Sequence, residues 1–183
     1  LSKCYYSRRR LSKEEDIRVR IYRALRGGRK VDDKLRQRNT DELLRLLKRN
    51  SQTDKIISLH QELLNDYVGH YGPGDAIVIK TLWTLAELTH PRPIFVDYYL
   101  QIVRTLNKES PTCHPEAFQP LVVVATELWN QGRYSDAVQH FKILFTSFIS
   151  NPKLSPKFQD QTFVQTIFNR YTHCLRSVRT EFT

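Results

Sequence analysis

The stretch FQPLVVVATELWNQGRYSDAVQHFKILFTSF, residues 118–148, consists of two helix-forming segments on either side of Gln131-Gly132-Arg133. Apolar residues recur every three or four positions in both segments, a spacing that predicts amphipathic helices. Gly132 marks the turn, because glycine readily adopts the backbone conformations that end a helix. The stretch therefore predicts a helical hairpin.

The hairpin pattern occurs more than once. Val124-Ala125-Thr126-Glu127 matches the character of Leu85-Ala86-Glu87-Leu88, which lies 39 residues earlier, and the match runs on without a gap through Asp97 and Asp136. Another step of 39 residues gives a weaker match around Leu43. Repeats at a fixed period predict stacked hairpins, in which a terminal unit is often degenerate.

The apolar spacing, together with the Gly and Pro residues between periodic segments, predicts the helices of this stack. They are expected at residues 40–49, 53–70, 75–89, 94–108, 116–131, 134–150 and 158–179. Asp75 and Ser135 lie near the starts of two of them, where short polar side chains cap free backbone amides. The chain is therefore predicted to be all-α, with stacked antiparallel hairpins.

One family has this pattern. Gly132-x-Tyr134-x-x-Ala137-x-x-x-Phe141 resembles the second half of a tetratricopeptide (TPR) repeat, and the preceding helix matches the first half. The matching positions of the two helices are Leu121, Val124, Ala125 and Leu128, then Ala137, Phe141 and Leu144. Small residues such as Ala125 let two helices approach closely. The resemblance implies a TPR-like α-solenoid with residues 158–179 as its C-terminal capping helix.

The period of 39 residues is longer than the usual TPR unit. Residues 71–78, ahead of Leu82-x-x-Leu85-Ala86-x-Leu88, resemble the long-repeat TPRs of kinesin light chain. His114-Pro115 is similar to the His-Pro helix entry of that family, and the resemblance covers about residues 40–152. Tyr98 in place of a small residue and Pro93 in place of the turn glycine are departures from the pattern. An ordinary helical bundle is the alternative fold.

In a TPR stack the first helix of each hairpin lines a concave groove, so the resemblance also implies a binding site. Carried over through the 39-residue register, the groove residues are Arg45, Lys48, Lys80, Trp83, Glu87, Val122, Thr126 and Trp129. Tryptophan is strongly enriched among residues that dominate binding energy. The other interpretation is that Trp83 and Trp129 are buried against neighbouring helices or covered by the C-terminal helix.

The chemistry of these positions suggests the type of ligand. The expected groove is basic at one end and apolar at the other, and it lacks the Lys/Asn pattern with which TPR clamps hold a C-terminal carboxylate. An amphipathic helix or an extended segment with an acidic part and an apolar part would fit it best. The sequence does not identify the partner or indicate an oligomeric state.

Charge divides the chain differently from the repeats. The formal net charge is +10, and residues 1–50 contain 17 Lys or Arg against 7 Asp or Glu, whereas residues 51–183 contain 12 of each. This asymmetry indicates two functional parts. We expect a basic arm and amphipathic helix in residues 1–39 and the helical repeat domain in residues 40–183.

Within the basic part, residues 1–12 are predicted to be an arm and Ser12 to start a helix that ends at Gly27-Gly28. Ser12 and Glu15 have the spacing of a capping box, in which each side chain satisfies a backbone amide of the other. The helix has an apolar stripe and an arginine-rich remainder, formed by Ile17, Ile21 and Leu25 and by Arg18, Arg20, Arg23 and Arg26.

Three uses of this helix compete: packing its stripe on the first hairpin, binding an acidic protein surface, and binding nucleic acid or anionic lipid through phosphates. Arg8-Arg9-Arg10-Leu11-Ser12 also has the form of a basophilic kinase site. Phosphate on Ser12 would then benefit from the positive end of the helix dipole, whereas the simpler interpretation is that Ser12 is an N-cap.

No catalytic, cofactor or metal motif occurs. A glycine-rich phosphate loop, GxSxG and HExxH are missing from the sequence, as is an apolar run long enough for a membrane span. Three separated cysteines indicate a reducing, cytoplasmic compartment. We therefore expect a non-enzymatic adaptor or scaffold segment of a larger protein, without cofactors, that binds a protein or peptide. The alternatives are binding to nucleic acid or an anionic surface through the N-terminal helix, and a purely buttressing role.

Overall fold

The computed structural model describes residues 2–27, 33–108, 113–150 and 159–180, and the side chains of residues 2–12, 26–27, 33 and 180 lie outside that description. Within these ranges every regular element is a helix, as predicted. The chain forms two compact units, Leu1–Leu59 and His60–Thr183. This division falls inside a helix and not at residue 39, so the predicted functional boundary stays a prediction.

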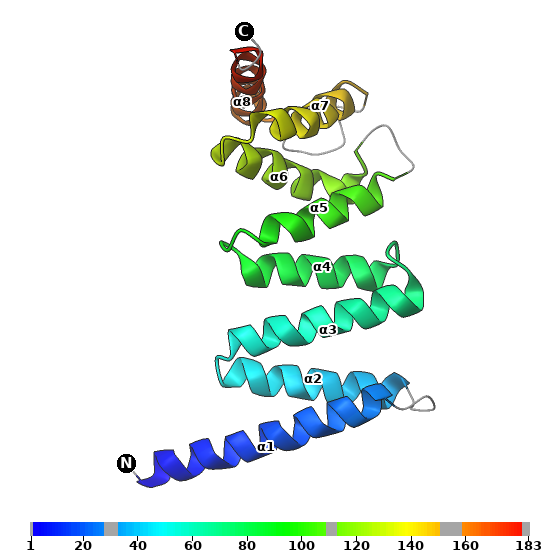
Figure 1. Cartoon of the computed structure of the whole chain (residues 1–183), viewed down its shortest axis with the longest axis vertical. Coiled ribbons are helices and arrows are strands. Elements are labelled where there is room, and N and C mark those ends of the chain that lie inside the picture. The colour runs from blue at the N-terminus through cyan, green and yellow to red at the C-terminus, as the bar shows by residue number, and fades with distance from the viewer. Residues whose placement is uncertain (1, 28–32, 109–112, 151–158, 181–183) are drawn as a thin grey trace. The chain divides into compact units, whose positions relative to one another are not determined.

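The first unit contains α1 (Ser2–Gly27), α2 (Asp33–Arg49) and the beginning of α3 (Thr53–Tyr71). The second contains the rest of α3 and α4 (Ala76–Thr89), α5 (Phe95–Leu106), the short 3₁₀ helix η1 (Pro115–Ala117), α6 (Phe118–Asn130), α7 (Tyr134–Ser150) and α8 (Gln161–Thr180) (Figure 1). The repeat helices lie where the sequence predicts them, except that α2 begins seven residues earlier than the expected residue 40, at Asp33.

In the second unit α4 and α5 form one antiparallel hairpin and α6 and α7 form the next, with α5 packed on α6 (Figure 1). The 39-residue register is visible in their burial. Ala86 and Ala125 are both 0% exposed where the helices of each hairpin meet, and Ile102 and Phe141 are 0% exposed one helix later. Residues 39 positions apart are therefore buried at the same place in successive hairpins, as the repeat predicted.

The turns of the second unit have local causes. Asp75 caps α4, because its carboxylate accepts a hydrogen bond from the Ile77 amide at 2.8 Å. Gly132 has a φ of +73°, which is unfavourable for residues with a Cβ and ends α6. His114 caps η1 with Pro115 as the first helical residue, so the predicted His-Pro entry into the third hairpin is confirmed.

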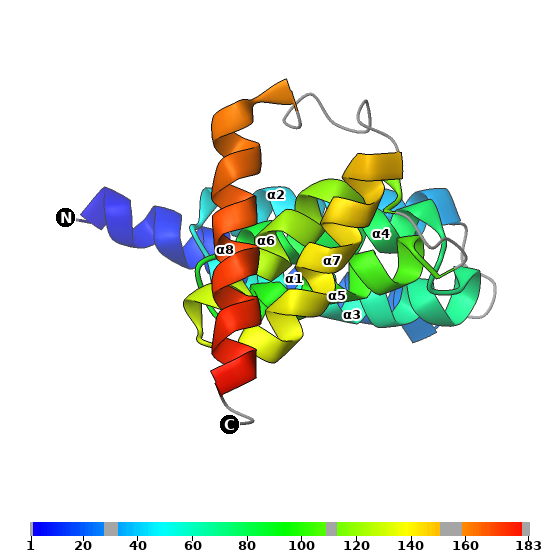
Figure 2. The same ribbon diagram turned by 90° about the horizontal axis from the view of Figure 1, so that it is seen from above.

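α8 covers the last hairpin. It runs across α7 (Figure 2), and it buries Ile167 and Cys174 in the same apolar cluster as Phe141 and Leu144. Apolar side chains at these positions remove the exposed face of α7 from water, which stabilises the end of a repeat stack. The predicted capping helix is present.

The start of α1 corrects one prediction. α1 begins at Ser2, so Ser12 does not start a helix, and no Gly or Pro interrupts residues 2–12. The Glu15 carboxylate does not cap the backbone as expected. Instead it accepts a hydrogen bond from the Gln52 amide at 3.0 Å and pairs with Lys55. The Ser12 side chain lies outside the described residues, so its phosphorylation stays a prediction without the helix-start argument.

The buried side of α1 is also not the predicted apolar stripe. Ile17 is 58% exposed and Ile21 is 38% exposed, whereas Glu15 and Tyr22 are each only 5% exposed. The ion pairs of Glu15 and Arg18 orient the helix, so its isoleucines point to solvent. α1 packs against α2, as one of the three expected uses requires, but Ile17 and Ile21 of the predicted stripe do not lie on the packed side.

α2 contains an unusual core residue. Leu43, Leu46 and Leu47 are buried at the positions that the repeat register predicts, but Asn39 is 4% exposed and neither end of its amide has a hydrogen-bond partner. In the same register the equivalent residues are Val78 and Ala117, both buried. A buried amide without partners is unfavourable, because it loses its hydrogen bonds to water.

We predict that Asn39→Val stabilises the protein by roughly 1–2 kcal/mol, since it removes the unpaired amide and introduces the residue of the next repeat. Urea unfolding monitored by circular dichroism measures the change. The control is Asn65→Val, the same substitution at an exposed helical position, which is expected to have little effect. An Asn39→Val variant that is less stable than the parent would show that the amide contributes to folding.

Candidate functional site

The predicted groove residues of α4 lie beside a shallow pocket of about 440 Å³ in the second unit. The pocket is lined by Gly74, Ala76, Ile79, Lys80, Trp83 and Glu116. Lys80 and Glu87 are exposed and Trp83 is half-buried. A cation, an aromatic ring and an aliphatic side chain therefore line the same pocket, which lies between the start of α4 and the entry to the next hairpin.

Trp83 is held in place by a second aromatic residue. Its ring meets Tyr99 of α5 edge-on, with centroids 5.3 Å apart and an interplanar angle of 79°, and Tyr99 packs against Phe95 in the same manner. Burial, assisted by the negative charge of Glu87, raises the pKa of Tyr99 above its ordinary value. The phenol thus stays neutral and supports Trp83 as a fixed aromatic surface.

The predicted groove residues Trp129 and Thr126 of α6 contact side chains of the C-terminal helix. The Trp129 indole N–H donates a hydrogen bond to Nδ1 of His173 at 3.3 Å, and the Arg170 guanidinium lies 5.0 Å from the centre of the indole ring. Arg170 also donates to Thr126 at 3.0 Å. Both partners are on α8, so α8 covers this part of the expected groove. Val122 is half-buried and packs on the apolar core.

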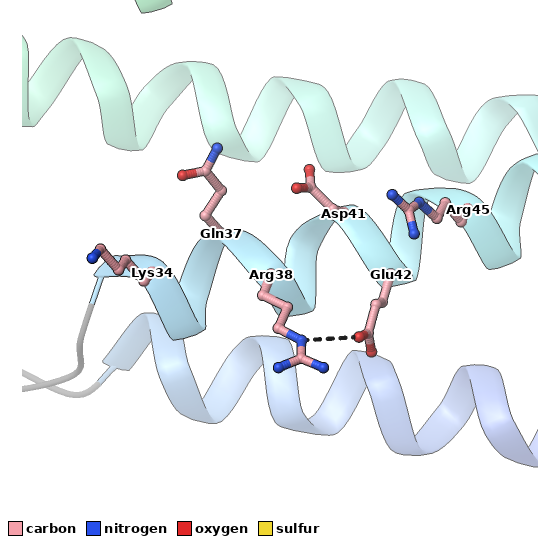
Figure 3. Close-up of a pocket in the computed structure, with 6 residues that line it drawn as sticks. All are labelled: Lys34, Gln37, Arg38, Asp41, Glu42 and Arg45. Atoms are coloured by element: carbon pink, nitrogen blue, oxygen red, sulfur yellow. Dashed lines mark hydrogen bonds and ion pairs between the residues drawn. The ribbon is translucent and has the colours of Figure 1, made fainter.

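In the first unit, Arg45 and Lys48 are exposed on α2. A second pocket of about 440 Å³ runs along this helix and is lined by Lys34, Gln37, Arg38, Asp41, Glu42 and Arg45. Figure 3 shows Gln37 and Asp41 on one side of α2 and Arg38 and Glu42 on the other. The lining contains both cations and carboxylates, so it has little net preference for an anion.

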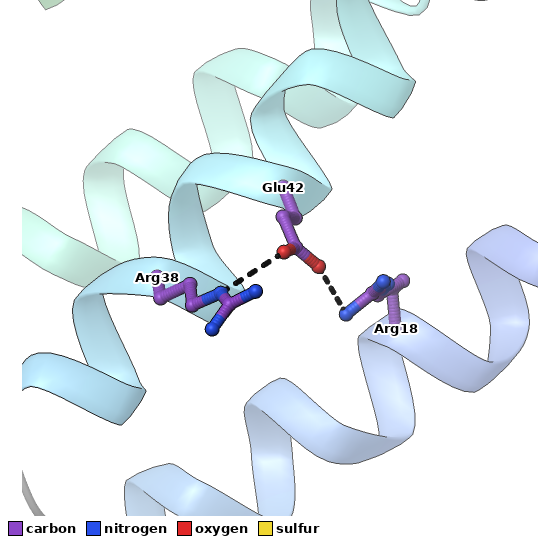
Figure 4. A network of polar contacts seen from close by, with 3 residues as sticks. All are labelled: Arg18, Arg38 and Glu42. Atoms are coloured by element: carbon purple, nitrogen blue, oxygen red, sulfur yellow. Dashed lines mark hydrogen bonds and ion pairs between the residues drawn. The ribbon is translucent and has the colours of Figure 1, made fainter.

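The arginines of α1 do not act as one surface. Arg18 pairs with Glu42, which also accepts a hydrogen bond from Arg38 at 3.4 Å (Figure 4). Arg20 and Arg23 are exposed, and the Arg26 side chain lies outside the described residues. Of the predicted basic residues, Arg18 therefore serves the contact with α2, while Arg20 and Arg23 face solvent.

Comparison with known proteins identifies the architecture. No protein-family model matches the sequence, and none of the curated proteins is similar to it. Two crystal structures of nearly identical TPR-like repeats, described as those of a kinesin light chain of Podosopora anserina, are similar to it in fold. One is 14% identical over 98% of this chain and 90% of that chain, with a TM-score of 0.55. The other is 12% identical over 97% and 93%, with a TM-score of 0.52.

The chain has a TPR-like helical-repeat fold. At these levels of sequence identity the similarity establishes the fold alone. The expected TPR-like architecture is thereby confirmed, while the groove residues carried over from the family stay a prediction. Within the described part of the chain, no helix combines the length and apolar character that crossing a bilayer requires.

Two residues that contact the expected groove, and that the sequence did not reveal, are on α8 of the TPR-like stack. Arg170 and His173 contact Trp129 across more than forty residues of chain. The repeat register compares equivalent positions, but it does not show which side chains of a non-repeated helix reach a given site. Their spacing of three residues, which puts both on one face of a helix, was the only available signal.

Shifted pKa values in the TPR-like stack mark buried structural groups. Burial raises the pKa of Cys113 to about 11, only partly offset by its hydrogen bond with Asn107, and burial also raises the pKa of Cys174. Both are free thiols that stay protonated and therefore unreactive at neutral pH. Among the described residues, no group of His, Cys, Asp and Glu has an arrangement that could hold a metal ion.

His140 on α7 gives the structure a pH dependence. Its Nδ1 atom is buried without a hydrogen-bond partner. Burial lowers its pKa below the ordinary 6.5; nearby Asp136 opposes this shift, and Arg104 and Arg133 add to it. The unfolded chain therefore binds this proton more readily than the folded chain does. The stability that His140 contributes is complete above pH 6.5 and is lost as the pH falls below it.

We predict that lowering the pH from about 7.5 to about 5.5, across the ordinary imidazole titration, destabilises the parent protein more than the His140→Gln variant. Thermal unfolding at both pH values measures the difference. His70→Gln, at an exposed histidine, should retain the full pH dependence of the parent. Equal acid sensitivity of the parent and His140→Gln proteins would contradict the assignment.

Proposed function

We propose that this TPR-like stack is a non-enzymatic scaffold or adaptor segment that binds a protein partner through the surface of α4, the first helix of its hairpin. One observation carries the proposal: the pocket in the second unit is lined by Lys80 and Trp83, two of the positions expected to face the groove. Repeat stacks commonly use such surfaces for extended protein ligands. A role in the cytoplasm is part of the proposal and is supported by the free thiols Cys113 and Cys174.

The chemistry of the pocket suggests what the partner presents. The pocket carries one charge of each sign: the Lys80 ammonium would pair with a carboxylate of the partner and the Glu116 carboxylate with a cation. Trp83 and Ile79 would contact an apolar side chain. Contact with Tyr99 already orients Trp83, so binding costs little side-chain entropy there. An amphipathic helix or extended segment with one acidic and one apolar part meets the requirements of Lys80, Trp83 and Ile79.

The coverage by α8 narrows the surface that is open to such a partner. A ligand that reached Trp129 and Thr126 would have to displace the hydrogen bonds and the cation–π contact made by Arg170 and His173. Trp83, Lys80 and Glu87 require no such displacement. We therefore place the contact of the second unit on α4, and we propose Arg45 and Lys48 as contact residues of the first unit by itself.

We predict that Trp83→Ala combined with Lys80→Glu weakens partner binding by about tenfold or more, because an aromatic anchor and its neighbouring charge are lost together. Affinity capture with the intact chain, followed by quantitative mass spectrometry, measures which proteins lose recovery. Tyr71→Ala combined with Lys108→Glu is the matched control, since it removes one exposed aromatic ring and reverses one exposed charge elsewhere. Partners retained equally by all three proteins would show that the α4 surface is not the site.

A second candidate function is binding of nucleic acid or an anionic surface through α1. It is favoured by the exposure of Arg20 and Arg23, neither of which has an ion pair among the described residues, beside the exposed Ile17 and Ile21. Phosphate contacts by such arginines are electrostatic and weaken as salt is added. The tyrosines and arginines of residues 1–12 lie outside the described side chains.

We predict that this candidate, if correct, gives binding to a labelled single-stranded RNA or to phosphatidylserine vesicles that falls steeply with salt. Arg20→Glu combined with Arg23→Glu should reduce it by about tenfold or more. Lys108→Glu combined with Lys142→Glu changes the net charge equally and is the control. Fluorescence anisotropy and vesicle sedimentation are the measurements, and equal losses in both double variants would refute a specific role of α1.

A further inference from the structure

The outer face of α8 is apolar but uncovered. Ile149 at the end of α7 is 78% exposed, Phe168 is 48% exposed and Leu175 is 37% exposed. The two helices meet here, because the Phe168 ring of α8 lies 6.0 Å from the Phe145 ring of α7. Phe145 lies one helical turn before Ile149. We call Phe145, Ile149, Phe168 and Leu175 the α8 face. Large apolar side chains grouped on a surface in this way mark an interaction site.

The apolar side of α8 is wider than its contact with α7 requires. At 100° per residue, the apolar side chains from Phe163 to Phe168 span an arc of about 140° around the helix axis. Ile167 and Cys174, near one side of that arc, are buried against the hairpin. Phe168 and Leu175, at the other edge, are not. The apolar arc of the helix is thus only partly covered by the hairpin that it packs against.

The charged side chains that α8 itself carries have one sign. α8 contains no Asp or Glu, and its Arg176 and Arg179 are exposed without an ion pair among the described residues. Lys142 is exposed on α7, on the side of that helix that carries Ile149. Cations next to an apolar stripe are complementary to an apolar stripe with carboxylates beside it.

The earlier hairpins show the kind of element that fits. α6 packs against both the preceding α5 and the following α7, whereas α8 packs against α7 and, more weakly, α6. α8 crosses α7 (Figure 2), and the side chains on helix surfaces form ridges and grooves into which those of another helix can pack.

We propose that the α8 face binds an amphipathic helix of a partner protein, with acidic side chains flanking its apolar stripe. A second copy of the chain is a poorer occupant. The other exposed apolar helix face in the described residues, with Ile17 and Ile21 of α1, also adjoins a cation, Arg20, so self-association would bring like charges together.

The experiment uses a fluorescent synthetic peptide of about 18 residues, long enough for several helical turns, with leucines at helical spacing and glutamates on both flanks. A peptide with lysines in place of the glutamates is its control. We expect the intact chain to bind the acidic peptide and not the basic one in anisotropy titrations. Leu175→Glu, or Arg176→Glu with Arg179→Glu, should weaken binding by about tenfold or more.

Two further variants define the site. Asn169→Glu adds the same charge as Leu175→Glu at an exposed position outside the apolar arc, and should leave binding unchanged. Trp83→Ala with Lys80→Glu should also leave it unchanged, which separates this site from the proposed α4 surface. Hydrogen exchange of α8 should slow when the acidic peptide is bound to the parent protein and not to Leu175→Glu.

Several outcomes would overturn the proposal. They are failure of the acidic peptide to bind, equal binding of the basic peptide, and undiminished binding to Leu175→Glu. Binding to phosphatidylserine vesicles that Leu175→Glu abolishes, without binding of the peptide, would assign the face to a membrane. A dimer in sedimentation experiments that Leu175→Glu abolishes would assign it to a second copy.

Discussion

Close approach of paired helices is the constraint on which the repeat stack depends. Ala86 and Ala125 have no exposed surface, and a larger side chain at either position would force the helices of its hairpin apart. Close contact in turn lets Ile102 and Phe141 fill the space between successive hairpins. The surfaces that face outward are therefore set by packing inside, since side chains on the opposite faces of the same helices stay exposed.

The end of the stack shows how one added helix changes which surfaces stay exposed. α8 buries apolar surface of α7 and, through Arg170 and His173, also covers Trp129. In the preceding hairpin the helix that packs on α5 is α6, and Trp83 borders an open pocket there. Both tryptophans are partly buried, and they differ in the side chains that contact them. The same helix that covers one apolar surface exposes another in Phe168 and Leu175.

Local rules predicted much of the fold and rather less of the site. The Asp75 cap, the Gly132 turn and the buried positions of α6 depend on residues close in sequence or on a repeated spacing. The orientation of α1 was mispredicted, because its periodic isoleucines gave a stronger sequence signal than Glu15 and Arg18, whose ion-pair partners lie on other helices. The sequence offered coverage of Trp129 by the C-terminal helix only as an alternative. It did not identify Arg170 and His173 as the contacting residues, since α8 is not part of the repeat and its side chains have no register to follow.

The sequence by itself determined an all-helical, TPR-like stack, its hairpin boundaries and the residues that fill its core. It could do so because helix periodicity and a 39-residue repeat are properties of the chain alone. Only the tertiary structure decided which faces stay open. Exposure depends on what packs against each helix, and for α1 and α8 that was set by a few long-range ionic, hydrogen-bonding and aromatic contacts.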